Sequence, residues 1–259
     1  MSEFAFVGQS IPKIDAKEKV TGRAAFAADV MFPGMLYGKI VRCLKYAHAK
    51  VTKLDLSEAA KVPGVFKVLG PKDVTQKMYN TGVLDLMVSE PAGKILGDIE
   101  DQFIFTDWVK HQGDAIAGII AKTEEAAERA AEKIVVEYEP LPVYLTAEES
   151  KKPDAIQFTP LKPGNRAFQL PEAMFPNNTY GWGDAEAEMA KADLVIDKTF
   201  YTPKVKQCQM EPHSYVAYVD DQGRINCWTS TQMPKCVHAK IARLFQVPMT
   251  KVKINQTIV

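Results

Sequence analysis

"QGDAIAGIIAKTEEAAERAAEKIVVEYEPLP", residues 112–142, is the stretch that decides the fold of this chain. Its start at residues 114–121 is rich in isoleucine and alanine and predicts a strand, and the charged, alanine-rich segment at 122–134 predicts a helix. The stretch VVEYEPLP at residues 135–142 predicts a second strand, which two prolines end. Strand, helix and strand in this order indicate a small domain of the α+β (mixed α/β) class that ends near residue 145.

The start of this helix carries its own signals. Thr123 is the expected N-cap, because its hydroxyl can accept a hydrogen bond from a backbone N–H that has no partner within the helix. The residue three positions further on is Ala126, so the reciprocal capping box is absent. Glu124 and Glu125 place negative charge at the positive end of the helix dipole. We therefore expect the helix to begin directly after Thr123.

The chain before this block alternates apolar runs with turn residues. The apolar runs predict strands at residues 35–43, 51–54 and 65–69. Ser57 is expected to cap a short helix between the second and third of these strands. Residues 75–97 carry scattered glycine and proline with little periodicity, so we expect them to form a surface excursion.

The chain after this block changes in composition. Residues 147–178 are proline-rich, polar and weakly periodic, which is typical of a linker. A second domain is expected from near residue 180, because periodic elements resume there. These elements are a helix at 185–191, a strand at 194–201, a hairpin around the turn at 220–223, a helix at 234–245 and a strand at 252–259.

Composition and charge exclude several classes of protein. With 46% hydrophobic and 25% charged residues, the 259-residue chain has the composition of a globular protein. Lysine plus arginine and aspartate plus glutamate both number 32, and this balance argues against a nucleic-acid partner. No apolar run is long enough to span a membrane and no signal-peptide pattern is present, so we expect a cytoplasmic protein with no membrane partner. The four cysteines form no C-x-x-C pair and are expected to be reduced and mostly buried.

Local motifs for common chemistries are absent. The sequence has no G-x-S-x-G elbow, no phosphate-binding loop and no H-E-x-x-H zinc helix. The stretch GWGD at residues 181–184 could present N–H groups to an anion, but a turn that leads to a helix capped by Asp184 explains it better. The four histidines are too scattered for a zinc site and are expected to be hydrogen-bonded within the fold. Glu211 can be a site acid or a carboxylate that binds backbone N–H groups, and the role of His213 stays open. An aromatic cluster at residues 103–108 is expected to be packed, although it could also border a pocket.

Five segments in the same order resemble the molybdopterin-binding subunit of the xanthine dehydrogenase and aldehyde oxidase family, the molybdenum hydroxylases. The resemblance runs from about residue 11 to the end of the chain, and no single segment carries it alone. The segments are IPKIDAKEKVTGRAAFAADVMFPGMLYGKIVRC (11–43), HAKVTKLDLSEAAKVPGV (48–65), the block at 112–142, MEPHSYVAYVDDQGRINCWTSTQ (210–232) and KIARLFQVPMTKVKI (240–254).

The resemblance implies a domain plan and a cofactor. It implies an N-terminal extension at 1–20, an α/β hammerhead domain at 21–145, a linker at 146–179 and the first part of a molybdenum-cofactor-binding domain at 180–259. In the family pattern, the glutamine of the S-T-Q tripeptide lies beside the molybdenum and hydrogen-bonds an oxygen ligand of the metal, so Gln232 is the expected cofactor-binding residue. The amide donates without adding charge, which suits it to orient such a ligand. The alternative for Gln232 is that it caps the helix that starts at Pro234.

The same resemblance implies what these residues lack. The family pattern continues after the strand at 252–259 with a glycine-rich segment that lines the cofactor, and a glutamate far downstream acts as the base. Neither has a match here, so no catalytic residue and no metal ligand is assigned in this chain. We expect an N-terminal portion of the catalytic subunit that is inactive alone and does not retain molybdenum-molybdopterin. The alternatives are a non-catalytic assembly or binding module and one half of a gene-split molybdenum subunit.

The resemblance further implies partners and a reaction type. The parent enzyme is expected to hydroxylate a heteroaromatic or aldehyde carbon with oxygen from water. Electrons are expected to pass to iron–sulfur and FAD centres on partner subunits or domains, and the remainder of the molybdopterin subunit is itself an expected partner. Substrate choice does not follow from these residues.

Overall fold

The computed structural model describes residues 7–79, 101–158, 163–165 and 182–258. The chain divides into two compact units. The first contains Met1–Tyr79, Gln102–Val143 and His213–Val259, and the second contains Asn80–Asp101 and Tyr144–Pro212. None of the helices within the described ranges combines the length and apolar character that a membrane crossing requires.

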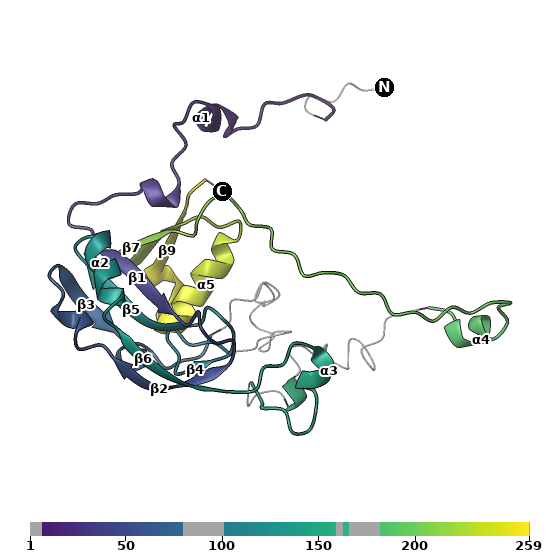
Figure 1. Ribbon diagram of the computed structural model, residues 1–259. Helices are drawn as coiled ribbons and strands as arrows, with labels where there is room; N and C mark the ends of the chain where they lie inside the picture. The colour runs from purple at the N-terminus through teal and green to yellow at the C-terminus, as the bar shows by residue number, and fades with distance from the viewer. Residues whose placement is uncertain (1–6, 80–100, 159–162, 166–181, 259) are drawn as a thin grey trace. The chain divides into compact units, whose positions relative to one another are not determined.

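The first sheet of unit one has the order β1-β5-β3 and is antiparallel throughout (Figure 1). Strand β5 (Ala115–Ala121) is central, with β1 (Tyr37–Arg42) and β3 (Val65–Leu69) at its two sides. Helix α2 (Glu124–Ala131) follows β5 and packs against β1 and β5. The strands and the helix predicted in this region are therefore confirmed.

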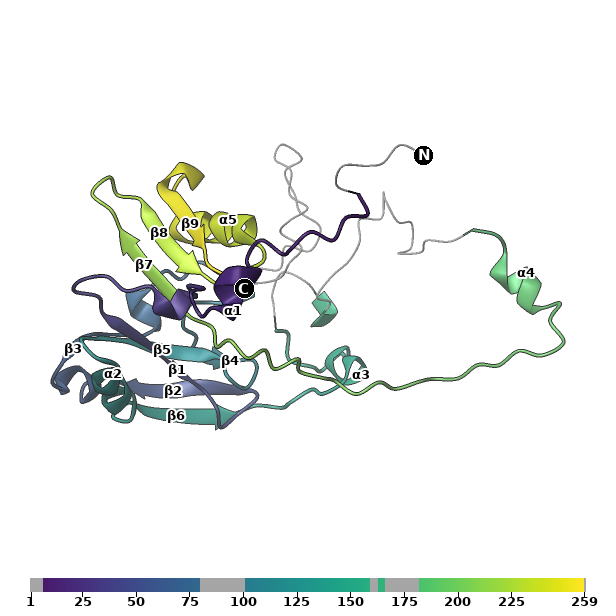
Figure 2. The ribbon, with the colours of Figure 1, turned by 90° about the horizontal axis from the view of Figure 1, so that it is seen from above.

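The second sheet of unit one has the order β4-β2-β6. Strand β2 (Ala49–Asp55) is central between β4 (Trp108–Val109) and β6 (Val135–Pro140), and both pairings are antiparallel. Figure 2 shows β2 and β6 side by side, with β1 and β5 in the neighbouring layer. Because β5 and β6 belong to different sheets, α2 connects the two layers instead of closing a parallel β-α-β unit.

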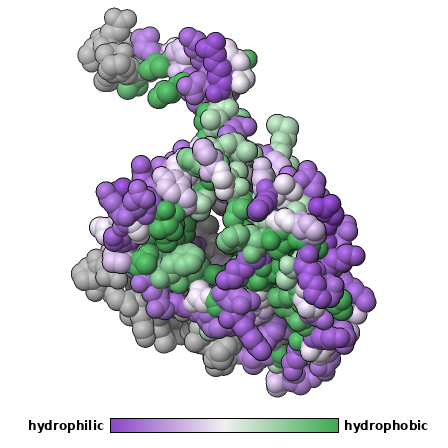
Figure 3. Space-filling view, turned by 90° about the vertical axis from the view of Figure 1, so that its left-hand side faces the viewer, coloured by the Kyte–Doolittle hydropathy of each residue, from purple (hydrophilic) through white to green (hydrophobic). Residues whose placement is uncertain are grey.

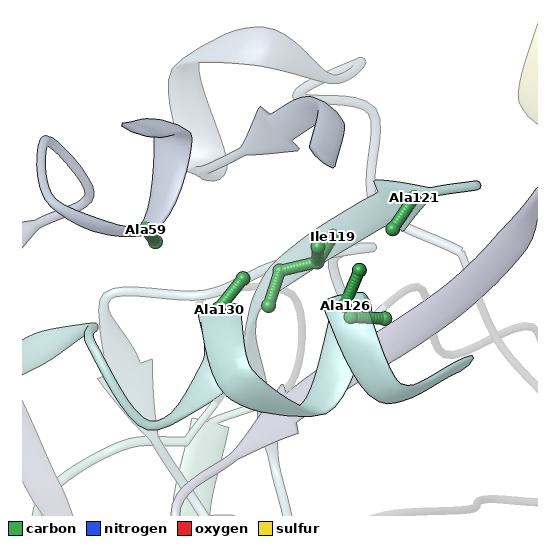
Figure 4. Packing of buried hydrophobic residues seen from close by; sticks show 6 residues of the cluster. Ala59, Ile119, Ala121, Ala126 and Ala130 are labelled. Atoms are coloured by element: carbon green, nitrogen blue, oxygen red, sulfur yellow. The ribbon is translucent and has the colours of Figure 1, made fainter. Parts of the chain in front are cut away.

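The core between α2 and its sheet is built mostly from alanine. The cluster contains Ala59, Ile119, Ala121, Ala126, Ala127 and Ala130, and Figure 4 shows the helix and strand side chains facing one another. Side chains this small let the helix backbone approach the sheet closely. A second cluster joins the two sheets through Cys43 and Ile116 from one layer and Ala49 and Val109 from the other.

The two helix caps predicted in the N-terminal half of the chain had different outcomes. Thr123 caps α2 as expected, with its side chain accepting a hydrogen bond from the Ala126 backbone N–H. Ser57 does not cap a helix, and this prediction is wrong. A short 3₁₀ helix, η2 (Ala59–Lys61), begins there with Glu58 at its N-cap. The carboxylate of Asp55 accepts the backbone N–H of Ser57 at 3.0 Å, so an aspartate turn takes the place of the expected cap.

The third sheet of unit one is a hairpin with one added strand. Strands β7 (Tyr215–Val219) and β8 (Ile225–Thr229) are antiparallel, and β9 (Val252–Gln256) lies parallel to β8. Gly223 in the hairpin turn has a φ of 69°, as its predicted role requires. Helix α5 (Pro234–Phe245) connects β8 to β9 and packs on β9, so β8, α5 and β9 form a β-α-β unit.

Unit two holds only short elements among its described residues. Helix α3 (Ala147–Ser150) lies inside the predicted linker, where Thr146 and Glu149 form a capping box. Helix α4 (Ala185–Met189) is capped by Asp184 as expected. The strand predicted at 194–201 is wrong, because these residues are extended without sheet partners among those described, and Phe200 is 84% exposed.

The remaining elements are short. They are α1 (Ala16–Val20), η1 (Ala27–Asp29), η3 (Pro71–Asp73), η5 (Pro163–Asn165) and η7 (Met249–Lys251). Most of the surface excursion predicted at 75–97 and much of the linker predicted at 147–178 lie outside the described residues.

Candidate functional site

The carboxyl ends of β8 and β9 meet at one edge of the third sheet. The two strands are parallel, and their register pairs Thr229 with Gln256 at this edge. Gln232 lies in the short loop that leaves β8 here and enters α5, and it is exposed. Ligands of α/β proteins collect at the carboxyl ends of parallel strands, so this edge is the candidate site.

Backbone and side-chain hydrogen bonds hold the loop that carries Gln232. The Thr231 hydroxyl accepts the Met233 backbone N–H at 3.1 Å, and Gln256 donates from Nε2 to the Thr231 carbonyl oxygen at 2.8 Å. The Thr257 backbone N–H donates to the Thr229 carbonyl oxygen at 3.3 Å. The residues that lead from β8 to Gln232 are therefore bound to the end of β9, and Met233 is bound back to Thr231, so the backbone is held on both sides of Gln232.

The start of α5 shows which residue occupies the cap position, and so bears on the alternative that Gln232 caps this helix. The N-cap position belongs to Met233, which makes no side-chain capping bond, and Pro234 occupies the first turn. Proline has no backbone N–H, so the start of this helix has one fewer N–H group that needs a hydrogen-bond partner. Gln232 precedes the N-cap and is exposed.

Three polar side-chain atoms at the same edge are buried and have no hydrogen-bond partner in the described part of the chain. They are Thr229 Oγ1, Asn255 Nδ2 and Thr257 Oγ1. Thr229 is 1% exposed, and the other two residues are partly buried. Buried polar groups are nearly always hydrogen-bonded in native proteins, so each of these atoms needs an explanation, and a bound group is one of them.

The edge suits an oxygen-rich organic group and not a bare metal ion. Its side chains are amides and hydroxyls, which donate and accept hydrogen bonds without charge. Within the ranges that the structure describes, no group of three or more histidine, cysteine, aspartate or glutamate side chains lies close enough to hold a metal. The residues present therefore fit a cofactor that brings its own metal ligands.

The histidines with resolved contacts have structural partners. Trp108 donates from Nε1 to His48 Nε2 at 3.0 Å, and His48 Nδ1 bonds the Pro142 carbonyl oxygen. His111 Nε2 lies 3.1 Å from the Asp114 carboxylate, and His238 Nε2 bonds the Met249 carbonyl oxygen at 2.8 Å. These histidines are hydrogen-bonded within the fold, as the sequence predicts.

The other residues singled out in the sequence lie away from this edge or carry structural contacts. Asp184 caps a helix of only five residues. The aromatic residues at 103–108 are packed, because Phe105 is buried against Gly118 and Trp108 bonds His48. Glu211 and His213 precede β7, and their functional roles stay predictions.

The cysteines are all free thiols. Cys43, Cys227 and Cys236 are buried, and Cys208 is exposed. Burial raises the pKa of the Cys227 thiol, which disfavours the nucleophilic thiolate. The prediction of reduced, mostly buried cysteines is confirmed.

Sequence reasoning missed Asn255 and Thr257. The signal was the run from Val252 to Gln256, in which an apolar strand becomes polar at its carboxyl end. The sequence could not show that these polar groups would be buried, because their burial depends on segments far away in the chain.

Comparison with known proteins gives the family of the chain. Residues 21–142 match the family described as the aldehyde oxidase and xanthine dehydrogenase a/b hammerhead domain, and residues 169–259 match the molybdopterin cofactor-binding domain. The xanthine dehydrogenase molybdenum-binding subunit of Escherichia coli O157:H7 is 30% identical over 95% of this chain and 31% of its own length. The nicotinate dehydrogenase large molybdopterin subunit of Eubacterium barkeri is 30% identical over 98% of this chain and 54% of its own length.

Solved structures give the same result. The aldehyde oxidoreductase from Desulfovibrio gigas superimposes with a TM-score of 0.75 at 28% identity, over 95% of this chain and 26% of that one. The aldehyde oxidoreductase from Desulfovibrio desulfuricans gives a TM-score of 0.74 at 30% identity, over 96% of this chain and 27% of that one. The chain thus spans about a third to a half of the curated relatives named above. It belongs to the xanthine dehydrogenase and aldehyde oxidase family of molybdenum hydroxylases, and it corresponds to the N-terminal portion of the family's molybdopterin-binding subunit.

Proposed function

We propose that these residues form the hammerhead scaffold and the first cofactor-facing edge of the catalytic subunit of a molybdenum hydroxylase. The observation that carries the proposal is the position of Gln232 between β8 and α5, at the carboxyl ends of two parallel strands. When bound, molybdenum-molybdopterin supplies the two-electron chemistry that hydroxylates a heteroaromatic or aldehyde carbon with oxygen from water.

The part of Gln232 in this function is to bind and orient. Its amide nitrogen can donate to an oxygen of the bound cofactor, and its amide oxygen can accept from a second group. A neutral donor orients the cofactor without adding charge beside the metal centre, whereas a lysine or arginine would add a positive charge. The hydrogen bonds of Thr231 and Gln256 restrict the loop, which lowers the entropy cost of placing this amide.

We further propose that residues 1–259 do not catalyse the reaction alone. The glycine-rich segment and the base glutamate implied by the family pattern have no match in these residues. A general base must lie within hydrogen-bond reach of the proton that it removes. Metal analysis and an activity screen on the polypeptide 1–259 test this point, and stoichiometric molybdenum with turnover would contradict it. Retained folding and a specific partner without molybdenum in the parent protein would favour an assembly module instead.

Partners and compartment follow from the same proposal. Iron–sulfur and FAD subunits or domains are the proposed electron acceptors, together with the remainder of the molybdopterin subunit. Unit one exposes large apolar side chains that such partners could cover, among them Ile40, Phe66 and Val219. Figure 3 shows apolar and polar side chains interspersed on one face of the molecule. The cytoplasm is the proposed compartment, because its reducing conditions keep four free thiols reduced.

The experiment that tests the role of Gln232 uses the full-length subunit assembled with its partners. Gln232→Ala is expected to lower kcat about tenfold to a hundredfold, the range found when groups that orient metal ligands are removed. Gln222→Ala is the matched control, because this exposed glutamine lies in the hairpin turn of the same sheet. Molybdenum per subunit is measured in parallel. Wild-type kcat in Gln232→Ala at full molybdenum content would refute the proposed role.

A further inference from the structure

Besides Gln232, the third sheet carries two polar residues of interest, Asn255 and Thr257, at the edge where the carboxyl ends of β8 and β9 meet. We propose that Asn255 and Thr257 form a binding site for an oxygen-bearing group of the molybdopterin cofactor, on the face of β9 that also carries Trp228 of β8. This inference rests on the proposed function and deepens it, because it assigns cofactor binding to residues that no sequence motif marks.

The register of the sheet places the two side chains together. Residues two apart on a strand point to the same face, so Asn255 and Thr257 are neighbours. Asn255 is paired with Trp228 across the parallel ladder, which puts both on one face. Gln256 lies between them, points to the opposite face and is bound to the Thr231 carbonyl oxygen. The proposed site therefore consists of two residues and excludes Gln256.

The surroundings of this face explain why the two polar groups lack partners in the described part of the chain. The ring of Trp228 stacks on Tyr218 at 5.6 Å and contacts the ring of Phe32 at 5.1 Å. Asn255 Nδ2 and Thr257 Oγ1 are nevertheless shielded from solvent. An amide beside aromatic rings finds few acceptors, and an unmet donor costs about as much as a lost hydrogen bond.

The chemistry of the two groups defines the ligand. An amide nitrogen only donates, so Asn255 requires an acceptor oxygen. A hydroxyl donates and accepts, so Thr257 can serve either a phosphate or a carbonyl oxygen. Neither residue carries charge. The ligand is thus an oxygen-rich group whose own charge is balanced elsewhere, which fits the organic part of the cofactor and not its metal.

Thr229 is not included in this site. Its side chain points to the opposite face, as the alternation along β8 requires, and that face is covered by α5. Thr229 is also 1% exposed as a whole residue, whereas Asn255 and Thr257 are only partly buried.

The test uses the full-length subunit in its assembled enzyme and isosteric substitutions. Asn255→Leu and Thr257→Val remove the polar groups and keep the side-chain volume. Lys253→Leu is the control, because this exposed residue lies on the same face of β9 two positions earlier. Molybdenum per subunit is measured by elemental analysis after repeated gel filtration, and pterin content by fluorescence after oxidation.

The expected result is a loss of about fivefold to tenfold in molybdenum and pterin retention for each site variant, and none for Lys253→Leu. Thermal unfolding of cofactor-free protein provides the second readout. Its midpoint should stay equal or rise in both site variants, since an unmet polar group has been replaced by an apolar one.

Two outcomes would overturn the inference in different ways. Full retention in the site variants together with a lowered midpoint would mean that solvent or the protein itself satisfies Asn255 and Thr257. In that case the proposed function stands if Gln232→Ala still lowers kcat. A wild-type enzyme without molybdenum would overturn both the proposed function and this inference.

Discussion

The ring of Phe32 packs on the ring of Trp228, with 5.1 Å between centroids and 59° between planes. Phe32 lies in the turn before β1, and Trp228 lies on β8, so residues predicted to belong to two domains pack together in one compact unit. Phe32 also contacts Tyr218 at 5.4 Å in an edge-on arrangement. Each aromatic pair of this kind contributes about 0.5–1.5 kcal/mol beyond its buried area.

We predict that Phe32→Ala lowers the free energy of unfolding by about 1–3 kcal/mol, because it removes both aromatic contacts. The expected drop in melting temperature is about 2–4 °C for each kcal/mol. Thermal unfolding followed by tryptophan fluorescence measures it. Phe66→Ala is the matched control, since Phe66 is 66% exposed and should change stability by less than about 0.5 kcal/mol. Equal effects of the two substitutions would contradict the role assigned to Phe32.

The hydrogen bond between Trp108 and His48 gives a second prediction. An indole nitrogen can only donate, so His48 Nε2 must accept, and Nδ1 must carry the hydrogen that bonds the Pro142 carbonyl oxygen. Trp108→Phe keeps an aromatic ring but leaves a buried acceptor unsatisfied on His48, which is 2% exposed. We expect a loss of about 1–3 kcal/mol in unfolding free energy, measured by urea denaturation. Trp182→Phe, at a residue that is 91% exposed, should leave the urea midpoint unchanged.

The contact between Gly118 and Phe105 gives a third prediction. A Cβ atom at Gly118 would lie 2.5 Å from Cζ of Phe105, closer than real Cβ contacts allow. Gly118→Ala should therefore destabilise the fold by about 1–3 kcal/mol through overpacking. Gly38→Ala in β1 is the control, because a Cβ there meets nothing within 4 Å.

Relief of the same clash makes that prediction sharper. In Gly118→Ala combined with Phe105→Leu, the smaller side chain frees space for the methyl group. The cost of Gly118→Ala should then be smaller in the Phe105→Leu background than in the wild type, as a double-mutant cycle measures. Strict additivity of the two costs would show that the clash is absent.

Asp220 in the hairpin turn gives a prediction about pH. Its carboxylate accepts hydrogen bonds from the backbone N–H groups of Arg224 and Gln222 and from the side chains of Arg224 and Asn226. These bonds lower the pKa of Asp220 from 3.8 to about 2. Because the pKa of Asp220 is lower in the folded chain than in the unfolded chain, its carboxylate stabilises the fold fully when the pH is above the unfolded pKa. This stabilisation is lost as the pH falls towards the folded pKa.

Asp220→Asn removes this contribution. The wild type should be more stable than the variant at pH 6, and the difference should shrink as the pH falls from about 4 to about 2. Urea midpoints measured across this range provide the test. Asp221→Asn removes a carboxylate from the same turn but keeps the Asp220 bonds, so it should retain the wild-type loss of stability at low pH. A constant difference between wild type and Asp220→Asn would rule out the assigned role.

Much of the fold could be predicted because its signals are local. All strands of unit one except the two-residue β4 follow from periodicity, as do α2 with its cap at Thr123 and α5 with Pro234. The hairpin turn follows from Gly223, a residue of special conformation. One failure is local, since the Asp55 turn replaces the cap expected from Ser57, and the other depends on distant partners. Residues 194–201 have the composition of a strand, yet no described neighbour offers them a ladder.

The candidate site was predictable only in part. The loop position of Gln232, between a strand and a helix, follows from sequence pattern, whereas its role came from resemblance. The pairing of β8 with β9 could not be read from either strand alone, because β-pairing joins residues distant in sequence. Asn255 and Thr257 therefore became visible only once the register was known.

The alanine face of α2 leaves the hammerhead module little freedom to adjust. Alanine has no rotamers, so the alanines around Ala126 and Ala130 cannot turn aside to make room for an added methyl group. The whole helix would have to shift instead. Because α2 follows directly from β5 and leads into β6, such a shift would be passed to both sheets at once. The distance between α2 and the first sheet is thus set by side chains that are too short to rearrange, and a single added carbon atom in this contact would change that distance.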